Sequence, residues 1–88
     1  MGQNAPNPFK QLTTINYQLP QAGQVSLKIY NIAGQAVRTL VDEDKKVGSY
    51  EVVWDGKDES GQAVATGVYL YQIKAGKQGD IKKMIMLK

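Results

Sequence analysis

Hydrophobic and polar residues alternate with a period of two along most of the chain. Ile15, Tyr17 and Leu19 alternate with polar residues until Pro20 ends the run. The same alternation recurs at 25–29 and 50–54. Side chains two residues apart lie on one face of a β-strand, so each stretch predicts a strand with one face packed on a core and the other partly exposed to solvent. No window carries the 3.6-residue apolar period of a helix between capping residues, so we expect essentially no long helix.

Turn residues separate these runs at hairpin-like spacing. Gly34 is predicted as a left-handed position in the turn at 31–34. Val37, Leu40 and Val41 do not alternate cleanly, which predicts a bulge in the third strand. About seven short strands with turns about every 8–12 residues are typical of an all-β, Ig-like antiparallel two-sheet β-sandwich. The predicted core consists of Ile15, Tyr17, Val25, Leu27, Ile29, Val52, Trp54, Tyr69 and Tyr71.

The length and composition indicate a single globular domain. The chain has 88 residues, of which 42% are hydrophobic and 22% charged, and these fractions favour a folded domain over a disordered chain. We predict that residues 1–6 are a leader, either disordered or added for expression, and that 7–88 form the sandwich. No stretch approaches the ~20 apolar residues of a membrane helix, and the N-terminus lacks the pattern of a signal peptide.

The composition also removes several kinds of chemistry. The chain has no cysteine and no histidine, which excludes disulfides, thiol nucleophiles, thiolate zinc sites and imidazole bases. We therefore expect no enzyme activity and no cofactor. The net charge is +3 and the lysines are spread out, whereas a nucleic-acid surface shows a concentrated basic stripe with interleaved aromatic residues. We expect no nucleic-acid partner.

Three acidic residues lie close together in the longest loop, at 55–62. Asp55, Asp58 and Glu59 raise the possibility of a calcium site, but Lys57 occupies the second ligand position of a calcium-binding loop. The alternative is a solvated loop whose Asp side chains accept hydrogen bonds from nearby backbone N–H groups. Adjacent residues in one loop also rarely face each other across a cleft as a glycosidase pair must. We predict neither a metal site nor a catalytic pair.

Four aromatic residues have two possible roles. Tyr50, Trp54, Tyr69 and Tyr71 are predicted either as a sugar-binding platform or as core, and Tyr50 and Trp54 share a strand face with Val52. The stretch from Gly67 to Tyr71 matches the corner of Ig-type sandwiches, in which a Tyr near a strand start bonds back to the backbone. We assign structural roles to these four residues and to Gly67.

The last segment is apolar on both alternating faces and bounded by lysines. It is predicted either as a central strand buried on both sides or as an edge strand that offers side chains and open backbone groups to a partner. Lysines on such a strand protect it from aggregation. The candidate recognition residues are Lys82, Lys83, Met84, Ile85, Met86, Leu87 and Lys88.

Several stretches in a fixed order carry a resemblance to a known family. They are Asn7-Pro8-Phe9 and residues 13–20, 23–31, 34–40, 67–71 and 83–88. In these, the chain from Asn7 onward resembles the type A C-terminal sorting domains of the bacterial type IX secretion system. Lys10-Gln11 depart from the Asn-Pro that usually follows the family's opening Asn-Pro-Phe. The middle, 54–67, is similar to the Ig-like domain of flagellar hook-capping proteins, and the two families grade into each other.

The resemblance implies a function for each family. A sorting domain is non-catalytic and directs a larger secreted protein, covalently linked on its N-terminal side, through the periplasm and the outer-membrane secretion machinery to the cell surface. The family's export signal lies in the terminal segment, and a chain ending at Lys88 fits that placement. Hook-capping relatives instead assemble as structural protein. A third possibility, a carbohydrate-binding or adhesive module of an extracellular enzyme, rests on the Tyr and Trp content alone.

Overall fold

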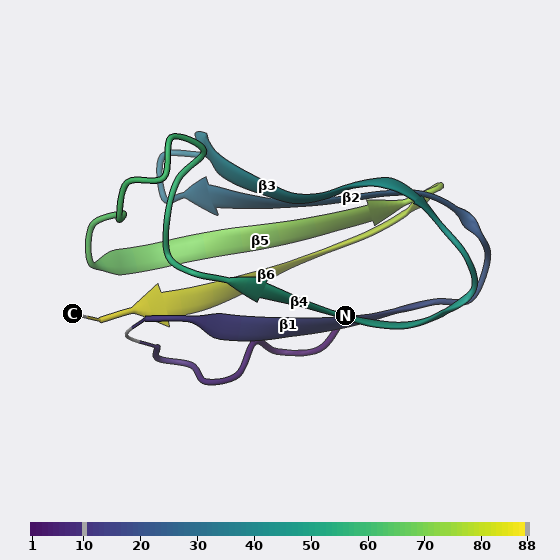
Figure 1. Ribbon diagram of the computed structural model, residues 1–88, viewed down its shortest axis with the longest axis horizontal. Coiled ribbons are helices and arrows are strands. Elements are labelled where there is room, and N and C mark those ends of the chain that lie inside the picture. The colour runs from purple at the N-terminus through teal and green to yellow at the C-terminus, as the bar shows by residue number, and fades with distance from the viewer. Residues whose placement is uncertain (10, 88) are drawn as a thin grey trace.

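The computed structural model describes residues 1–9 and 11–87, and this part of the chain forms six β-strands (Figure 1). The strands are β1 Thr13–Leu19, β2 Gly23–Asn31, β3 Ala36–Lys45, β4 Gly48–Trp54, β5 Gly67–Ala75 and β6 Gln78–Met86. We expected about seven. The loop between β4 and β5 contributes only an isolated bridge between Lys57 and Ala63, because its side chains satisfy its backbone groups locally.

Two antiparallel sheets form the sandwich. One contains β1 and β4, and the other has the strand order β3-β2-β5-β6. Tyr17 lies opposite Tyr50 in the small sheet, and Leu27 lies opposite Val41 and Ile73 in the large one. The strands run roughly along the 37 Å long axis of the molecule (Figure 1). The all-β, Ig-like two-sheet prediction is confirmed, with six strands.

The core lies between the two sheets and follows the period-two pattern. Trp54 is fully buried, with its ring centroid 5.6 Å from that of Phe9 and 5.5 Å from that of Tyr69. Every predicted core residue is buried except Val52, which is half-buried and packs at the core margin, as Tyr50 does. The core also contains six residues outside the predicted list, namely Phe9, Leu19, Val41, Ile73, Met84 and Met86.

Two local predictions about β2 and β3 are also confirmed. The register between these strands shifts between Leu27 and Lys28 and again between Ile29 and Tyr30, as the broken alternation predicted. Gly34 adopts a φ of 83° in the connecting turn. The turn is stabilised by the Asn31 side-chain oxygen, which accepts hydrogen bonds from two backbone N–H groups in the turn.

The first nine residues run between the edges of β1 and β6. On the β1 side, the N–H of Thr14 donates to the carbonyl of Ala5 across 2.8 Å. On the β6 side, the N–H of Leu87 donates to the carbonyl of Phe9 across 2.8 Å. The sandwich therefore contacts residues on both sides of the predicted boundary at residue 7; the boundary itself stays a prediction.

Candidate recognition surface

The predicted corner before β5 is present. Gly67 opens the strand with a φ of 153°, a conformation that residues with side chains rarely adopt. The hydroxyl of Tyr69 donates a hydrogen bond of 2.6 Å to the carbonyl of Ala65. Burial raises the pKa of Tyr69, so the phenol stays neutral and remains a donor. Gly67 and Tyr69 thus have the structural roles expected of an Ig-type corner.

The four aromatic residues do not form a flat exposed platform. Trp54 is buried and its indole N–H donates to the carbonyl of Lys57 across 2.9 Å. The buried hydroxyl of Tyr71 donates to the carbonyl of Gly2 and accepts from the N–H of Asn4. Tyr50 alone is half-buried. Trp54, Tyr69 and Tyr71 belong to the core, and Tyr50 packs against it from the margin.

The acidic residues of the 55–62 loop each have a different partner. The Asp58 carboxylate accepts hydrogen bonds from the hydroxyl and N–H of Ser60 and from the N–H of Gln62. Asp55 lies 3.6 Å from the Arg38 guanidinium, and Glu59 accepts from the N–H of Thr39 on β3. The hydrogen bond from the Ser60 hydroxyl is the largest cause that lowers the pKa of Asp58, and hydrogen bonds from backbone N–H groups lower it further. No group of three acidic side chains converges as a metal site in the described residues, and the expectation of no calcium site stays a prediction.

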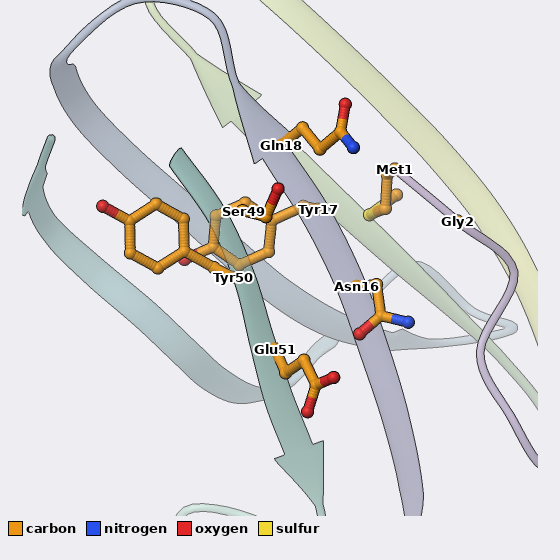
Figure 2. A pocket seen from close by; sticks show the side chains of 8 residues that line it. All are labelled: Met1, Gly2, Asn16, Tyr17, Gln18, Ser49, Tyr50 and Glu51. Carbon is orange, nitrogen blue, oxygen red and sulfur yellow. The ribbon is translucent and has the colours of Figure 1, made fainter. Parts of the chain in front are cut away.

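An open hollow of about 710 Å³ lies between the N-terminal segment and the small sheet (Figure 2). It brings together residues from three separate stretches of sequence, so local patterns gave no indication of it. The polar side chains that line it, Asn16, Gln18, Ser49 and Glu51, are exposed. Since water competes for every one of these groups, the hollow offers no preorganised chemistry.

The terminal candidate segment is neither a central strand nor an open edge. Met84 and Met86 are buried in the core, whereas Lys83, Ile85 and Leu87 are exposed and Lys82 is half-buried. In the described residues β6 lies at the edge of its sheet, next to β5. The central-strand interpretation is therefore wrong for this segment. Lys88 lies outside the described residues.

The backbone edge of β6 is covered by the N-terminal segment. The N–H of Ile85 donates to the Asn7 side-chain oxygen across 2.9 Å, and the carbonyl of Ile85 accepts from the N–H of Phe9 across 3.0 Å. The carbonyl of Lys83 accepts from the Gln3 side-chain amide across 2.9 Å. The expectation of open backbone groups is wrong here, and what this part of β6 offers a partner is its outward side chains.

Comparisons with known proteins agree with this fold. The FlgD Ig-like domain family matches residues 7–79. A crystal structure of FlgD from P. aeruginosa superposes with a TM-score of 0.65 at 24% identity, covering 84% of this chain and 57% of that chain. No curated protein matches the chain. The described residues contain no helix long and apolar enough to cross a membrane.

Two larger proteins of Porphyromonas gingivalis contain the same fold. Dimeric latent PorU superposes with a TM-score of 0.74 at 21% identity, covering 97% of this chain and 9% of PorU. PorZ, a surface component of the type IX secretion system, gives 0.64 at 24% identity, covering 98% of this chain and 11% of PorZ. This chain thus spans about half of FlgD and about a tenth of PorU and PorZ, and at these identities the likeness concerns the fold. Because the family match covers most of the sequence, the chain belongs to the FlgD Ig-like domain family.

Proposed function

We propose that this domain is a non-catalytic sorting and anchoring domain that directs a larger secreted protein through the type IX outer-membrane secretion system to the cell surface. In this proposal the cargo is covalently linked on the N-terminal side of the domain. The outward side chains at the end of β6 are what the export machinery recognises.

The division of side chains on β6 carries the proposal. Met84 and Met86 anchor the strand in the core, while Lys83, Ile85 and Leu87 project from it. A partner can therefore contact the projecting side chains while the sandwich stays folded. Ile85 and Leu87 lie two residues apart, are exposed and do not belong to the core, and exposed apolar side chains that lie together are typical of interaction sites.

The extent of each comparison supports the same choice. The FlgD-type match ends at residue 79, one residue after the start of β6. The superposition on PorU covers 97% of this chain and so includes most of β6. A sorting domain needs the terminal strand for recognition. The FlgD-type match does not include the part of β6 that we assign to this role.

A second candidate function is structural assembly of the hook-capping type. The observation that favours it is the family match itself, which spans 7–79. In that case the domain is a rigid spacer or packing module, and the end of β6 has no recognition role. Replacing the Ig-like domain of a hook-capping protein with this domain, and scoring motility, tests the second function directly.

Export of a reporter tests the first function. The domain is fused behind a reporter protein in a bacterium that has a type IX system, and the surface-exposed fraction of the reporter is measured. We expect Lys83→Ala with Ile85→Ser to abolish export. Exposed substitutions of this kind change the free energy of unfolding by only about 0.5 kcal/mol, so the purified variant keeps its melting curve.

A matched pair on β4 and in the loop that follows it provides the control. Lys57→Ala with Val53→Ser removes one exposed lysine and one exposed aliphatic side chain, since Val53 is 52% exposed. This variant should be exported normally. The proposal is wrong if both variants are exported equally, or if export is lost only in variants that also fail to fold.

A further inference from the structure

The outer face of the four-stranded sheet carries apolar side chains that the core does not use. Tyr30, Val68 and Leu70 alternate with buried residues along β2 and β5, so they point away from the core, and none of them packs against it. On β6, Ile81 and Ile85 are 54% and 37% exposed. Five apolar side chains thus lie on this face, of which Tyr30, Val68 and Leu70 are half-buried and Ile81 and Ile85 exposed.

Strand register joins these side chains into one band across β2, β5 and β6. Tyr30 lies opposite Leu70, and Val68 lies opposite Ile85. Ile81 lies opposite Gln72 and is therefore a diagonal neighbour of Leu70. Side chains directly opposite each other on antiparallel strands have Cβ atoms about 5 Å apart, close enough to touch. We call this band, Tyr30, Val68, Leu70, Ile81 and Ile85, the outer apolar band.

Lysines border the outer apolar band. Lys83 lies opposite Leu70, Lys28 lies opposite Gln72, and Lys74 lies opposite Ser26. None of the three forms an ion pair within residues 1–9 and 11–87. The carboxylate nearest in register, Asp42, lies opposite Ser26 and accepts from the Gln24 side chain, at the far end from Tyr30. On β2, β5 and β6 the outward positions beside the band therefore carry lysines and no carboxylate, and the acids of this face, Asp42 and Asp44, lie on β3.

We propose that the outer apolar band is a docking surface for a protein partner that presents apolar side chains between carboxylates. Apolar contact supplies the burial, and carboxylates opposite the unpaired lysines supply specificity and speed of association. A second copy of this chain is a poorer match, because its own band on β2, β5 and β6 offers lysines and no carboxylates to Lys28, Lys74 and Lys83. The proposal concerns the chemistry of the partner and holds whether or not that partner belongs to a secretion system.

Short synthetic peptides provide the probe. In one, isoleucine alternates with glutamate; in the second, isoleucine alternates with lysine; in the third, serine alternates with glutamate. Each is titrated into the ¹⁵N-labelled domain at low salt, and amide shifts are followed by NMR. We expect the isoleucine–glutamate peptide to move the amides around Tyr30, Leu70 and Ile85 and to bind about tenfold more tightly than either other peptide, with binding weakened by salt.

Two variants and one control distinguish specific binding at the outer apolar band from non-specific binding elsewhere on the surface. Leu70→Gln should weaken binding of the isoleucine–glutamate peptide. Lys28→Glu with Lys83→Glu, which leaves the core intact, should reverse the preference toward the isoleucine–lysine peptide. Lys57→Glu, in the β4–β5 loop and outside the band, should change neither the affinity nor the peptide preference.

Three results would overturn the proposal. The first is equal binding of all three peptides, or shifts elsewhere than on the outer apolar band. The second is binding to vesicles that contain phosphatidylglycerol with no preference among peptides, which would make the face a lipid surface. The third is concentration-dependent self-association through the same amides without peptide, which would make it an interface between copies.

Discussion

The hydroxyl of Tyr69 donates a 2.6 Å hydrogen bond to the carbonyl of Ala65, four residues earlier. The bond ties the end of the long β4–β5 loop to the first buried residue of β5. It therefore restrains the point at which β5 enters the sheet, next to Val68 and Leu70 on the outer face.

Tyr69→Phe removes this bond and keeps the ring that packs on Trp54. The carbonyl of Ala65 is left to water, so we expect a loss of about 1 kcal/mol in the free energy of unfolding, measured by urea denaturation. Tyr30→Phe, on the outer face, is the control and should change stability very little. Equal effects from both variants would mean that the corner contributes no stability of its own.

Trp54→Ala removes the largest fully buried side chain. Truncation of a large core side chain costs about 3–5 kcal/mol, and a domain of this size has little stability to spare, so we expect the variant to be largely unfolded at room temperature by circular dichroism. Trp54→Phe retains most of the packing and should stay folded with a lower melting temperature. A melting temperature for Trp54→Ala within about a degree of the parent would contradict the buried position.

Asp58 makes stability depend on pH on the acid side. Its hydrogen bonds, above all the one from the Ser60 hydroxyl, lower its pKa from the ordinary value of 3.8. The native state therefore favours the charged carboxylate. The resulting stability is present above the unfolded-state pKa and is lost as pH falls through the folded-state pKa.

In Asp58→Asn the free energy of unfolding should accordingly fall less steeply below about pH 4 than in the parent. Urea denaturation at several pH values measures this. Ser60→Ala removes the first donor and should raise the Asp58 pKa toward its ordinary value in an NMR titration of the carboxyl carbon. An unchanged Asp58 pKa in Ser60→Ala would show that the hydroxyl is not its cause.

Asn4→Ala tests whether the N-terminal segment is part of the folded unit. Asn4 is only 2% exposed, and its side-chain amide donates to the hydroxyl of Thr13 and the carbonyl of Pro6. Losing these buried bonds should cost about 1–3 kcal/mol and speed hydrogen exchange of the Thr14 amide, which is bonded to Ala5. Asn16→Ala, at an exposed site on β1, should do neither; a matching effect there would argue against the segment's role.

The sequence by itself determined the fold class and most of the core. The alternation of side chains is a property of each strand alone. The buried face that contains Ile15 and Tyr17 in β1, or Leu27 in β2, can therefore be identified without knowing which strands pair. Gly34 and Tyr69 were likewise predictable, because a left-handed turn and a strand-entry corner each depend on a few neighbouring residues.

The terminal candidate segment could be located from sequence, but not its environment. Alternation could not say which of Met84 and Ile85 faces inward, because both are apolar. Nor could it show that Asn7 and Phe9 cover the edge at Ile85, a contact between residues 78 positions apart. The outer apolar band likewise requires the strand order β2-β5-β6 and its register. Only the tertiary structure decided these features, because contacts between distant segments depend on how the strands pair and leave no periodic trace in either segment alone.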